Sequence, residues 1–398
     1  MKYDFTTLLD RRGRDSIAAD LVPWDVRPEP GFSTIPMWVA DMSFPTAPPI
    51  LEAIQKRLEM PNFGYFDLPD AYFDAIIHWQ SRRNGVTGLT KTDIGYENGV
   101  LGGVSSAVQA LTAPGEPILL HSPTYIGFTH TLNGLGRKIV LSPLRRDENG
   151  IWRMDYEDMD RKLRENRIHL AIFCSPHNPC GRVWERWELE KAMEIYAANG
   201  CTVLSDEIWS DIVMPGHSHI PLQSLSDDAR QRAIAFYAPS KTFSLAGLIG
   251  SYHIIFNPVL RDRVRRVSDA THYNDCNVLS LHALLGAYSP AGEEWVDEMR
   301  LVIDENLRYA CDFIAAHFPG VKAMRPEGTY MLFLDCGDWL RAHGCSLREL
   351  AHRGLRAGVI WQDGEAFHAP DSIRMNLALP RALLIEAMSR LEKYAFIE

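Results

Sequence analysis

The sequence predicts an α/β fold with a large domain, built on a mainly parallel sheet flanked by helices, and a smaller α+β domain. Through the middle of the chain, short apolar runs alternate with amphipathic stretches of about 10–15 residues, a pattern typical of strands joined by crossover helices. After about residue 290 the pattern changes to a long helical stretch followed by separate strands and helices. The length of 398 residues is sufficient for two or three domains.

The predicted strands of the large domain are short and apolar. They are Ile118–His121, Lys138–Leu141, Leu170–Cys174, Thr202–Ser205, Ala233–Tyr237 and Tyr252–Phe256. The helices predicted between them include Gly99–Leu111, Ile126–Leu135, Tyr156–Asn166 and Glu185–Asn199. Ligands of such sheets bind outside the carboxyl ends of the strands, so the residues after each strand are the first candidates for a site.

The smaller domain is predicted to begin with a long helix. Its expected elements are a helix at Glu293–Phe318, a strand at Gly328–Asp335, a helix at Leu347–Ala357, the apolar pair Val359–Ile360, a strand at Ser372–Asn376 and a final helix from Arg381. The first 45 residues, rich in Pro and Trp, are expected to form an arm that packs against this domain. The predicted division is therefore 1–45, 46–288 and 289–398.

Composition excludes several classes of protein. Hydrophobic residues make up 46% and charged residues 23%, which is globular usage and argues against a disordered chain, a collagen or a coiled coil. The formal net charge of −10 disfavours binding to nucleic acid or to anionic membranes. No targeting signal or membrane span is evident, and the seven cysteines read as reduced thiols, so we expect a cytoplasmic protein.

No metal site is expected. The pair His217 and His219 stands in a loop flanked by Pro and Gly, without a third ligand nearby in the sequence. We interpret this segment as a solvated loop.

Four residues with chemical potential follow four successive predicted strands. Tyr125, Asn178, Asp206 and Lys241 each come a few residues after a strand, and the Gly-rich segment 98–103 leads into a helix. Each feature alone has an ordinary explanation, such as a surface lysine, a helix cap or a turn. Together they match the needs of pyridoxal phosphate (PLP): an amine for a Schiff base, a carboxylate at the pyridine nitrogen, a donor for the phenolate, an aromatic face and a helix N-terminus for the phosphate.

Longer motifs carry a family resemblance from end to end. Ser-Pro-His-Asn-Pro-Cys-Gly at 175–181, Ser-Asp-Glu-Ile at 205–208 and Ser-Lys-Thr-Phe-Ser-Leu-Ala-Gly-Leu at 240–248 resemble the class I/II aminotransferase superfamily, PLP fold type I. Further motifs resemble its C–S lyase branch, the MalY/PatB-type cystathionine β-lyases. They are Asp10–Gly13, Trp38–Pro45, Phe63–Tyr65, His219–Pro221 and Thr329–Tyr330. The resemblance implies a seven-stranded sheet in the large domain and a homodimer with shared active sites.

The resemblance also implies residue roles. Lys241 would be the Schiff-base lysine, Asp206 would pair with the pyridine nitrogen, Asn178 would donate to the phenolate and Tyr125 would stack on the ring. The phosphate would be held by Val100, Leu101 and Ser240, and Tyr65 would reach the phosphate of the neighbouring subunit. Trp209 would lie beside the coenzyme. Arg374 and Ala40 would contact the substrate.

Four positions depart from the family patterns. Ala238 replaces a phosphate-binding Ser, and Ile249 replaces the phosphate-binding Arg of typical aminotransferases, a loss shared with the lyase branch. Trp209 stands where aminotransferases often have Tyr and lyases have His, and Ser43 stands where lyases commonly have Asp. An indole donates one hydrogen bond but neither accepts one nor titrates, so we expect these changes to affect the substrate rather than the coenzyme.

The leading hypothesis is β-elimination on S-substituted L-cysteines, giving a thiol, pyruvate and ammonia. An aminotransferase of an L-amino acid would use the same residues with a second half-reaction. A regulatory PLP protein acting through protein contacts is the third alternative.

Overall fold

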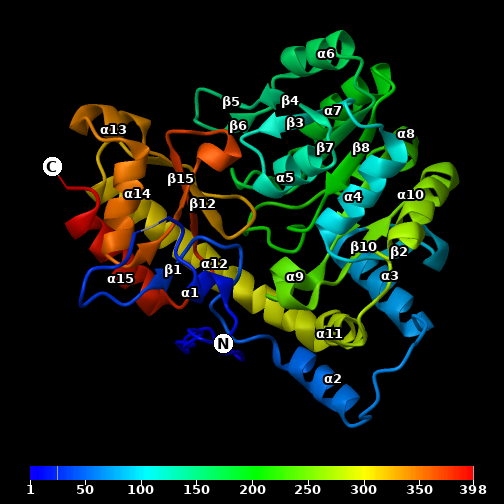
Figure 1. The fold of residues 1–398 in the computed structure, drawn as a ribbon, viewed down its shortest axis with the longest axis horizontal. Helices are drawn as coiled ribbons and strands as arrows, with labels where there is room; N and C mark the ends of the chain where they lie inside the picture. The colour runs from blue at the N-terminus through cyan, green and yellow to red at the C-terminus, as the bar shows by residue number, and fades with distance from the viewer. Residues whose placement is uncertain (25, 398) are drawn as a thin grey trace.

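The computed structural model describes residues 1–24 and 26–397 and contains a large and a small sheet (Figure 1). The large sheet has seven strands in the order β2-β10-β9-β8-β7-β3-β4. Their bounds are β2 Ile94–Glu97, β3 Pro117–Ser122, β4 Lys138–Pro143, β7 Leu170–Cys174, β8 Thr202–Asp206, β9 Ala233–Tyr237 and β10 Ser251–Ile254. Among these strands, β10 runs in the direction opposite to the other six, so the predicted mainly parallel sheet is confirmed.

Both faces of this sheet are buried. Along β7, Leu170 and Ile172 pack into one apolar core, whereas Ala171 and Phe173 pack into another. Since successive side chains of a strand point to opposite faces, these continuous apolar runs place helices on both sides. The helices of this part are α2 Pro48–Leu58, α3 Asp70–Asn84, α4 Val100–Leu111, α5 Ile126–Gly134, α6 Tyr156–Glu165, α7 Arg186–Ala198, α8 Asp227–Arg232, α9 Pro239–Thr242, α10 Pro258–Thr271 and α11 Val278–Ala287.

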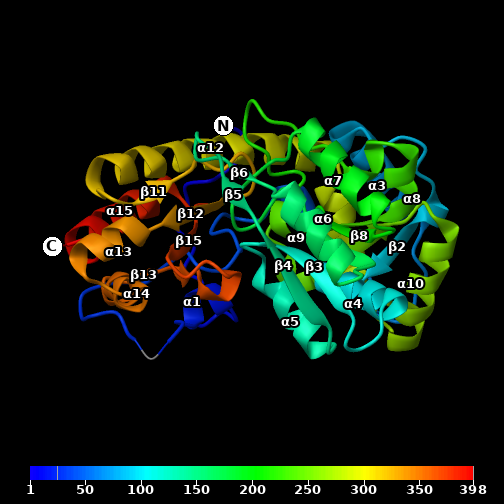
Figure 2. The same ribbon diagram turned by 90° about the horizontal axis from the view of Figure 1, so that it is seen from above.

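The long helix α12 (Pro290–His317) runs past both sheets (Figures 1 and 2). It begins three residues before the predicted Glu293, because Pro is compatible with a first helical turn and the Ser289 hydroxyl caps the N–H of Gly292. Beyond it lie β11 Lys322–Ala323, β12 Met331–Asp335, α13 Gly337–His343, α14 Leu347–Arg356, β13 Val359–Ile360, β14 Gln362–Asp363, β15 Ser372–Asn376 and α15 Arg381–Tyr394. The small antiparallel sheet has the order β11-β12-β15-β14.

One strand predicted from the sequence begins later than expected, and one strand of the large sheet was not predicted. The strand predicted from Gly328 starts only at Met331, because Thr329 has a left-handed backbone (φ 68°) and Gly328 bonds to Gly181 instead of continuing the ladder. The sequence patterns also missed β2, which is short and contains Gly95 and Glu97. Two further short strands, β5 Arg145–Arg146 and β6 Trp152–Arg153, form a separate hairpin.

The N-terminal segment crosses to the small domain. It contains the short helix α1 (Ile17–Asp20) and β1 (Ile35–Pro36), and β1 pairs in parallel with β13. One large apolar core continues from this segment through α12 into the small sheet. The division into 1–45, 46–288 and 289–398 stays a proposal. No helix in the described ranges is long and apolar enough to cross a membrane.

Candidate active site

The carboxyl ends of the central strands surround a cavity of about 190 Å³. Nine of the predicted site residues line it, namely Ala40, Val100, Leu101, Tyr125, Asn178, Asp206, Trp209, Ser240 and Lys241. They come from segments spread over two hundred residues of sequence. The parallel strands bring together all of these residues except Ala40, because the carboxyl ends of the strands lie at one edge of the sheet; Ala40 comes from the N-terminal segment.

Asp206 is the last residue of β8 and is 4% exposed. Among the described residues its carboxylate accepts one hydrogen bond, from the N–H of Ile208 at 3.1 Å. Burial raises the pKa of Asp206 to about 7, opposed by that hydrogen bond and by the positive charge of Lys241. A buried carboxylate with so few donors is suited to a protonated ring nitrogen placed in the cavity.

Lys241 lies in the short helix α9, directly after β9. Its Nζ donates to the carbonyl of Ala40 at 3.1 Å. Burial, together with the positive charge of Arg374, lowers the pKa of Lys241 to about 8, while Asp41 and Asp206 act in the opposite direction. An amine with a pKa near neutrality has a substantial neutral fraction, which a nucleophile or a general base requires.

Arg374 enters from the small domain on β15 and reaches the same cavity through Asn178. Its Nη1 donates to Asn178 Oδ1 at 3.1 Å, and its Nη2 donates to Gln362 Oε1 at 2.7 Å and to the carbonyl of Trp38 at 3.0 Å. The Nε atom is buried without a partner among the described residues. Burial lowers the pKa of Arg374 to about 10. A buried guanidinium with a free donor fits the carboxylate of an amino acid.

Tyr125 stands at the entry to α5, and its ring contacts Phe128 edge to face with centroids 5.3 Å apart. A Cβ at Gly127 would come within 2.4 Å of the Tyr125 ring. Glycine therefore permits this ring to lie back on the first turn of α5, at the wall of the cavity.

The first turn of α4 supplies backbone N–H groups at the wall of the same cavity. Gly99 precedes the helix with φ 76°, a conformation that favours glycine. At Gly103 a Cβ would meet the Phe236 ring at 2.6 Å, so glycine also lets α4 lie close to β9. The resulting helix N-terminus, with Ser240 nearby in the same cavity, can bind a phosphate group.

The chain matches the family model described as aminotransferase class I and II over residues 35–391. The chain belongs to this family. It is 34% identical over 388 residues to the cystathionine β-lyase PatB of Bacillus subtilis, covering 96% of this chain and 98% of that protein. It is 31% identical over 338 residues to the protein MalY of Escherichia coli, covering 84% of each.

Solved structures agree with the family assignment. Cystalysin from Treponema denticola, described as containing a pyridoxal 5'-phosphate cofactor, matches with a TM-score of 0.91 and 31% identity, over 99% of this chain and 98% of that one. The resemblance to the C–S lyase branch and the fold type I architecture predicted from the sequence are confirmed.

The structure shows where two of the four residues that depart from the family patterns lie. Trp209 is 2% exposed and packs edge to face on Tyr330, with ring centroids 4.7 Å apart. The Tyr330 hydroxyl is buried without a partner among the described residues, and burial raises its pKa. Sequence reasoning noted Tyr330 only as part of a motif. Ser43, by contrast, lines a separate hollow with Arg11 and Arg12 and is not among the residues that line the cavity.

His219 also departs from the expectation of a solvated loop. His217 is exposed, but the His219 side chain is 3% exposed and its Nε2 lies 2.7 Å from Glu207 Oε2. Glu207 is buried next to Asp206 and also accepts from the Tyr237 hydroxyl at 2.6 Å. No group of three or more potential metal ligands occurs within residues 1–24 and 26–397.

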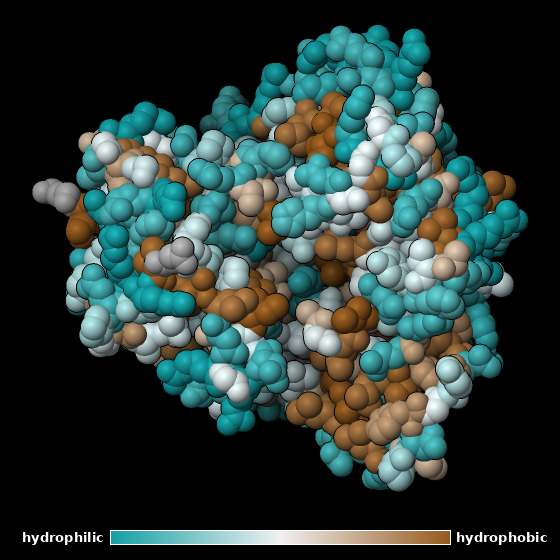
Figure 3. All heavy atoms as spheres, viewed as in Figure 1, coloured by the Kyte–Doolittle hydropathy of each residue, from teal (hydrophilic) through white to brown (hydrophobic). Residues whose placement is uncertain are grey.

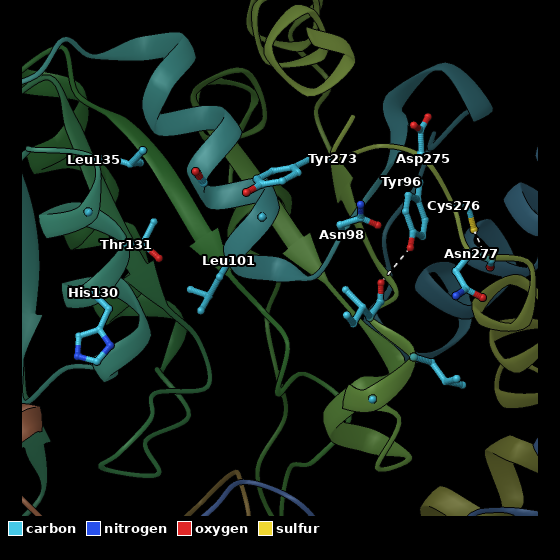
Figure 4. Close-up of a pocket in the computed structure, with 16 residues that line it drawn as sticks. Tyr96, Asn98, Leu101, His130, Thr131, Leu135, Tyr273, Asp275, Cys276 and Asn277 are labelled. Carbon is cyan, nitrogen blue, oxygen red and sulfur yellow. Dashed lines mark hydrogen bonds between the residues drawn. The ribbon is translucent and has the colours of Figure 1, made fainter. Parts of the chain in front are cut away.

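Tyr65 is the one predicted cofactor residue outside this chain's own cavity. It is fully exposed and lines a hollow with Phe63, Phe66 and the segment 275–279. A second, larger hollow of about 760 Å³ is also lined by residues 275–277 (Figure 4). This larger hollow shares Leu101 and Ile249 with the cavity, so it adjoins the wall where the phosphate is expected.

Proposed function

We propose that this chain is a PLP-dependent lyase that cleaves the Cβ–S bond of S-substituted L-cysteines, such as cystathionine. The products are a thiol, pyruvate and ammonia. The predictions of an enzyme and of PLP as its coenzyme are confirmed at the level of the family and its C–S lyase relatives. The substrate rests on similarity to proteins named cystathionine β-lyase.

The observation that carries the proposal is that Lys241 and Asp206 line one cavity, and that Arg374 is hydrogen-bonded to Asn178 in the wall of that cavity. The residues fit PLP because a buried carboxylate, a buried amine and a helix N-terminus each lack the partner that the coenzyme provides. When bound, PLP supplies an electron sink for the charge that develops at Cα of an amino acid.

The roles of the chain's residues follow from their positions. Arg374, through its free Nε and its Nη atoms, would hold the substrate carboxylate. The Lys241 amine, once released from the coenzyme, would take the proton from Cα. Asp206 would keep the ring nitrogen protonated, and the Asn178 amide would donate to the ring oxygen. The thiolate then leaves Cβ, and water completes the release of pyruvate and ammonia.

Aminotransfer is the second candidate, favoured by the family model itself. It requires the same Lys241, Asp206 and Arg374, and differs in where the proton is delivered. Aminotransferases typically have a phosphate-binding Arg at the position of Ile249 and a Tyr at the position of Trp209. The absence of these two residues here supports elimination. A regulatory PLP protein has no specific observation in its favour.

The deciding experiment supplies purified PLP-loaded protein with cystathionine and measures pyruvate with and without an added 2-oxo acid. We expect pyruvate in both cases, at equal rates. Turnover that depends on the 2-oxo acid would transfer the assignment to aminotransfer. Borohydride reduction should attach the coenzyme to Lys241, and peptide mapping that finds another lysine would overturn the proposed site.

We also propose a homodimer in which each subunit's Tyr65 reaches the phosphate of its partner. Support comes from the full exposure of Tyr65 and from the hollow beside the phosphate wall (Figure 4). Apolar side chains gather over α2 and the segment after it, at the lower edge of the face in Figure 3, where Leu51, Met60 and Phe63 are more than half exposed. A cytoplasmic location stays a proposal, supported by cysteines that are all free.

A further inference from the structure

Residues 38–42, which we call the strap, pass directly beside the Lys241 amine. Three side chains of the site region donate to its carbonyl groups: Lys241 to Ala40 at 3.1 Å, Arg374 to Trp38 at 3.0 Å, and Asn376 to Val39 and Asp41 at 2.7 and 2.8 Å. The strap therefore holds the expected base and the expected carboxylate clamp at the same time.

A second link joins the strap to the chain just after the lysine. The Ser244 hydroxyl donates to Asp41 Oδ1 at 2.8 Å and accepts from the N–H of Met42 at 3.1 Å. Ser244 has φ 58°, a left-handed conformation that costs a non-glycine residue free energy. Together with the hydrogen bond between Lys241 and Ala40, these contacts join residues 40–42 of the strap to residues 241–244.

Arg11 makes two further hydrogen bonds to the strap. Its Nη1 donates to the carbonyl of Met42 at 2.6 Å, and its Nη2 donates to Asp41 Oδ2 at 2.9 Å. The Arg11 side chain is 18% exposed and that of Asp41 is 32% exposed, so this ion pair is partly shielded from water. The neighbouring Arg12 differs, because its partner is Asp10 and both side chains are more than 60% exposed.

We infer that Arg11 is a positioning residue for Lys241 and Arg374, acting through Asp41, Ser244 and the strap. This inference rests on the proposed function for the roles of Lys241 and Arg374. The inference assigns a structural role to the motif Asp10–Gly13, which neither coenzyme binding nor substrate binding explains. Without the guanidinium, Met42 and Asp41 lose their outer partners, and the Ala40 carbonyl loses its fixed place beside the amine.

The test compares Arg11→Ala with the control Arg12→Ala in the PLP-loaded protein. Hydrogen exchange of peptides covering the strap, measured without substrate, should accelerate at least tenfold in the Arg11 variant and remain unchanged in the control. A charged hydrogen bond contributes roughly 1.5–3 kcal/mol, so kcat/KM for pyruvate release should fall about 10- to 100-fold, with kcat lowered through Lys241 and KM raised through Arg374. Arg12→Ala should keep the parent kcat.

A double-mutant cycle with Ser244→Ala tests the route. If Arg11 acts through Asp41 and Ser244, the double variant should be little worse than the more damaging single variant, whereas independent roles give multiplied losses. Unchanged strap exchange in Arg11→Ala, or multiplied losses, would overturn the inference. Hydrogen exchange is measured without turnover. A parent protein that lacks lyase activity would therefore reject the proposed function, while the exchange result would still decide the inference about Arg11.

Discussion

Asp206 shows how one buried group can be suited to a partner that the chain itself does not provide. Its pKa of about 7 lies well above the ordinary 3.8 because burial disfavours the charged form. Between these two pH values the folded chain binds more protons at this site than the unfolded chain does. In the coenzyme-free protein, this residue's contribution to stability therefore falls as pH rises from about 4 to 7.

Asp206→Asn should remove that pH dependence. The coenzyme-free variant should lose less stability than the parent as pH rises from 4 to 7, by on the order of 1 kcal/mol per pH unit. Urea denaturation of both proteins across this range measures the difference, and buried groups such as His121 cancel in the comparison. Parallel curves would show that the Asp206 pKa is not raised by folding.

With PLP bound, the same variant should retain coenzyme and lose most of its turnover.

Arg374→Ala should weaken substrate use far more than coenzyme binding. Two charged hydrogen bonds to a carboxylate contribute roughly 1.5–3 kcal/mol each, so kcat/KM should fall on the order of 10²–10⁴-fold. Steady-state kinetics and a PLP titration separate the two effects. Arg356→Ala, which removes an arginine paired with Glu349 on the exposed face of helix α14, is the control and should leave both quantities unchanged. A loss below about threefold in the Arg374 variant would assign the carboxylate to another residue.

At the scale of elements, the approach of α4 to β9 sets the position of the expected phosphate site. Two adjacent glycines of α4 make a matched pair. A Cβ at Gly103 would lie 2.6 Å from the buried Phe236 ring, whereas a Cβ at Gly102 would meet Tyr273 at an ordinary 3.7 Å.

Gly103→Ala should therefore destabilise the protein by about 1–3 kcal/mol, through overpacking against β9. Gly102→Ala should be neutral or stabilising by up to about 1 kcal/mol, because alanine favours the helix. Chemical denaturation of the coenzyme-free proteins measures both changes. The Gly103 variant should also bind PLP more weakly, since displacing α4 moves its N-terminal N–H groups. Equal stability of the two variants would mean that α4 does not need this close contact.

At the scale of the whole molecule, the position of Tyr65 predicts that one chain does not complete its own site. Lys241→Ala subunits and subunits carrying Tyr65→Ala should each be weakly active or inactive alone. Mixed dimers should regain activity, because one of the two sites then combines an intact Lys241 with the partner's intact Tyr65. Subunit mixing followed by the pyruvate assay checks this, with each variant incubated alone as control. Confirmed mixed dimers without activity would reject shared sites.

The sequence by itself determined the α/β class, the family and the order of site residues along the chain. Tyr125, Asn178, Asp206 and Lys241 could be predicted because each follows an apolar strand, and strand ends of a parallel sheet converge by topology. Lys241 and Asp206 line one cavity for that reason.

Only the tertiary structure decided which distant groups touch. Nothing local in the sequence indicates that Arg11 meets Asp41, that His219 pairs with Glu207, or that Ser43 lies away from the cavity. Hydrophobic periodicity reports which face of an element is buried, but not which polar groups lie opposite one another. Those pairings depend on how the N-terminal segment and the small domain pack on the sheet, and buried polar groups then take whichever partners that packing supplies.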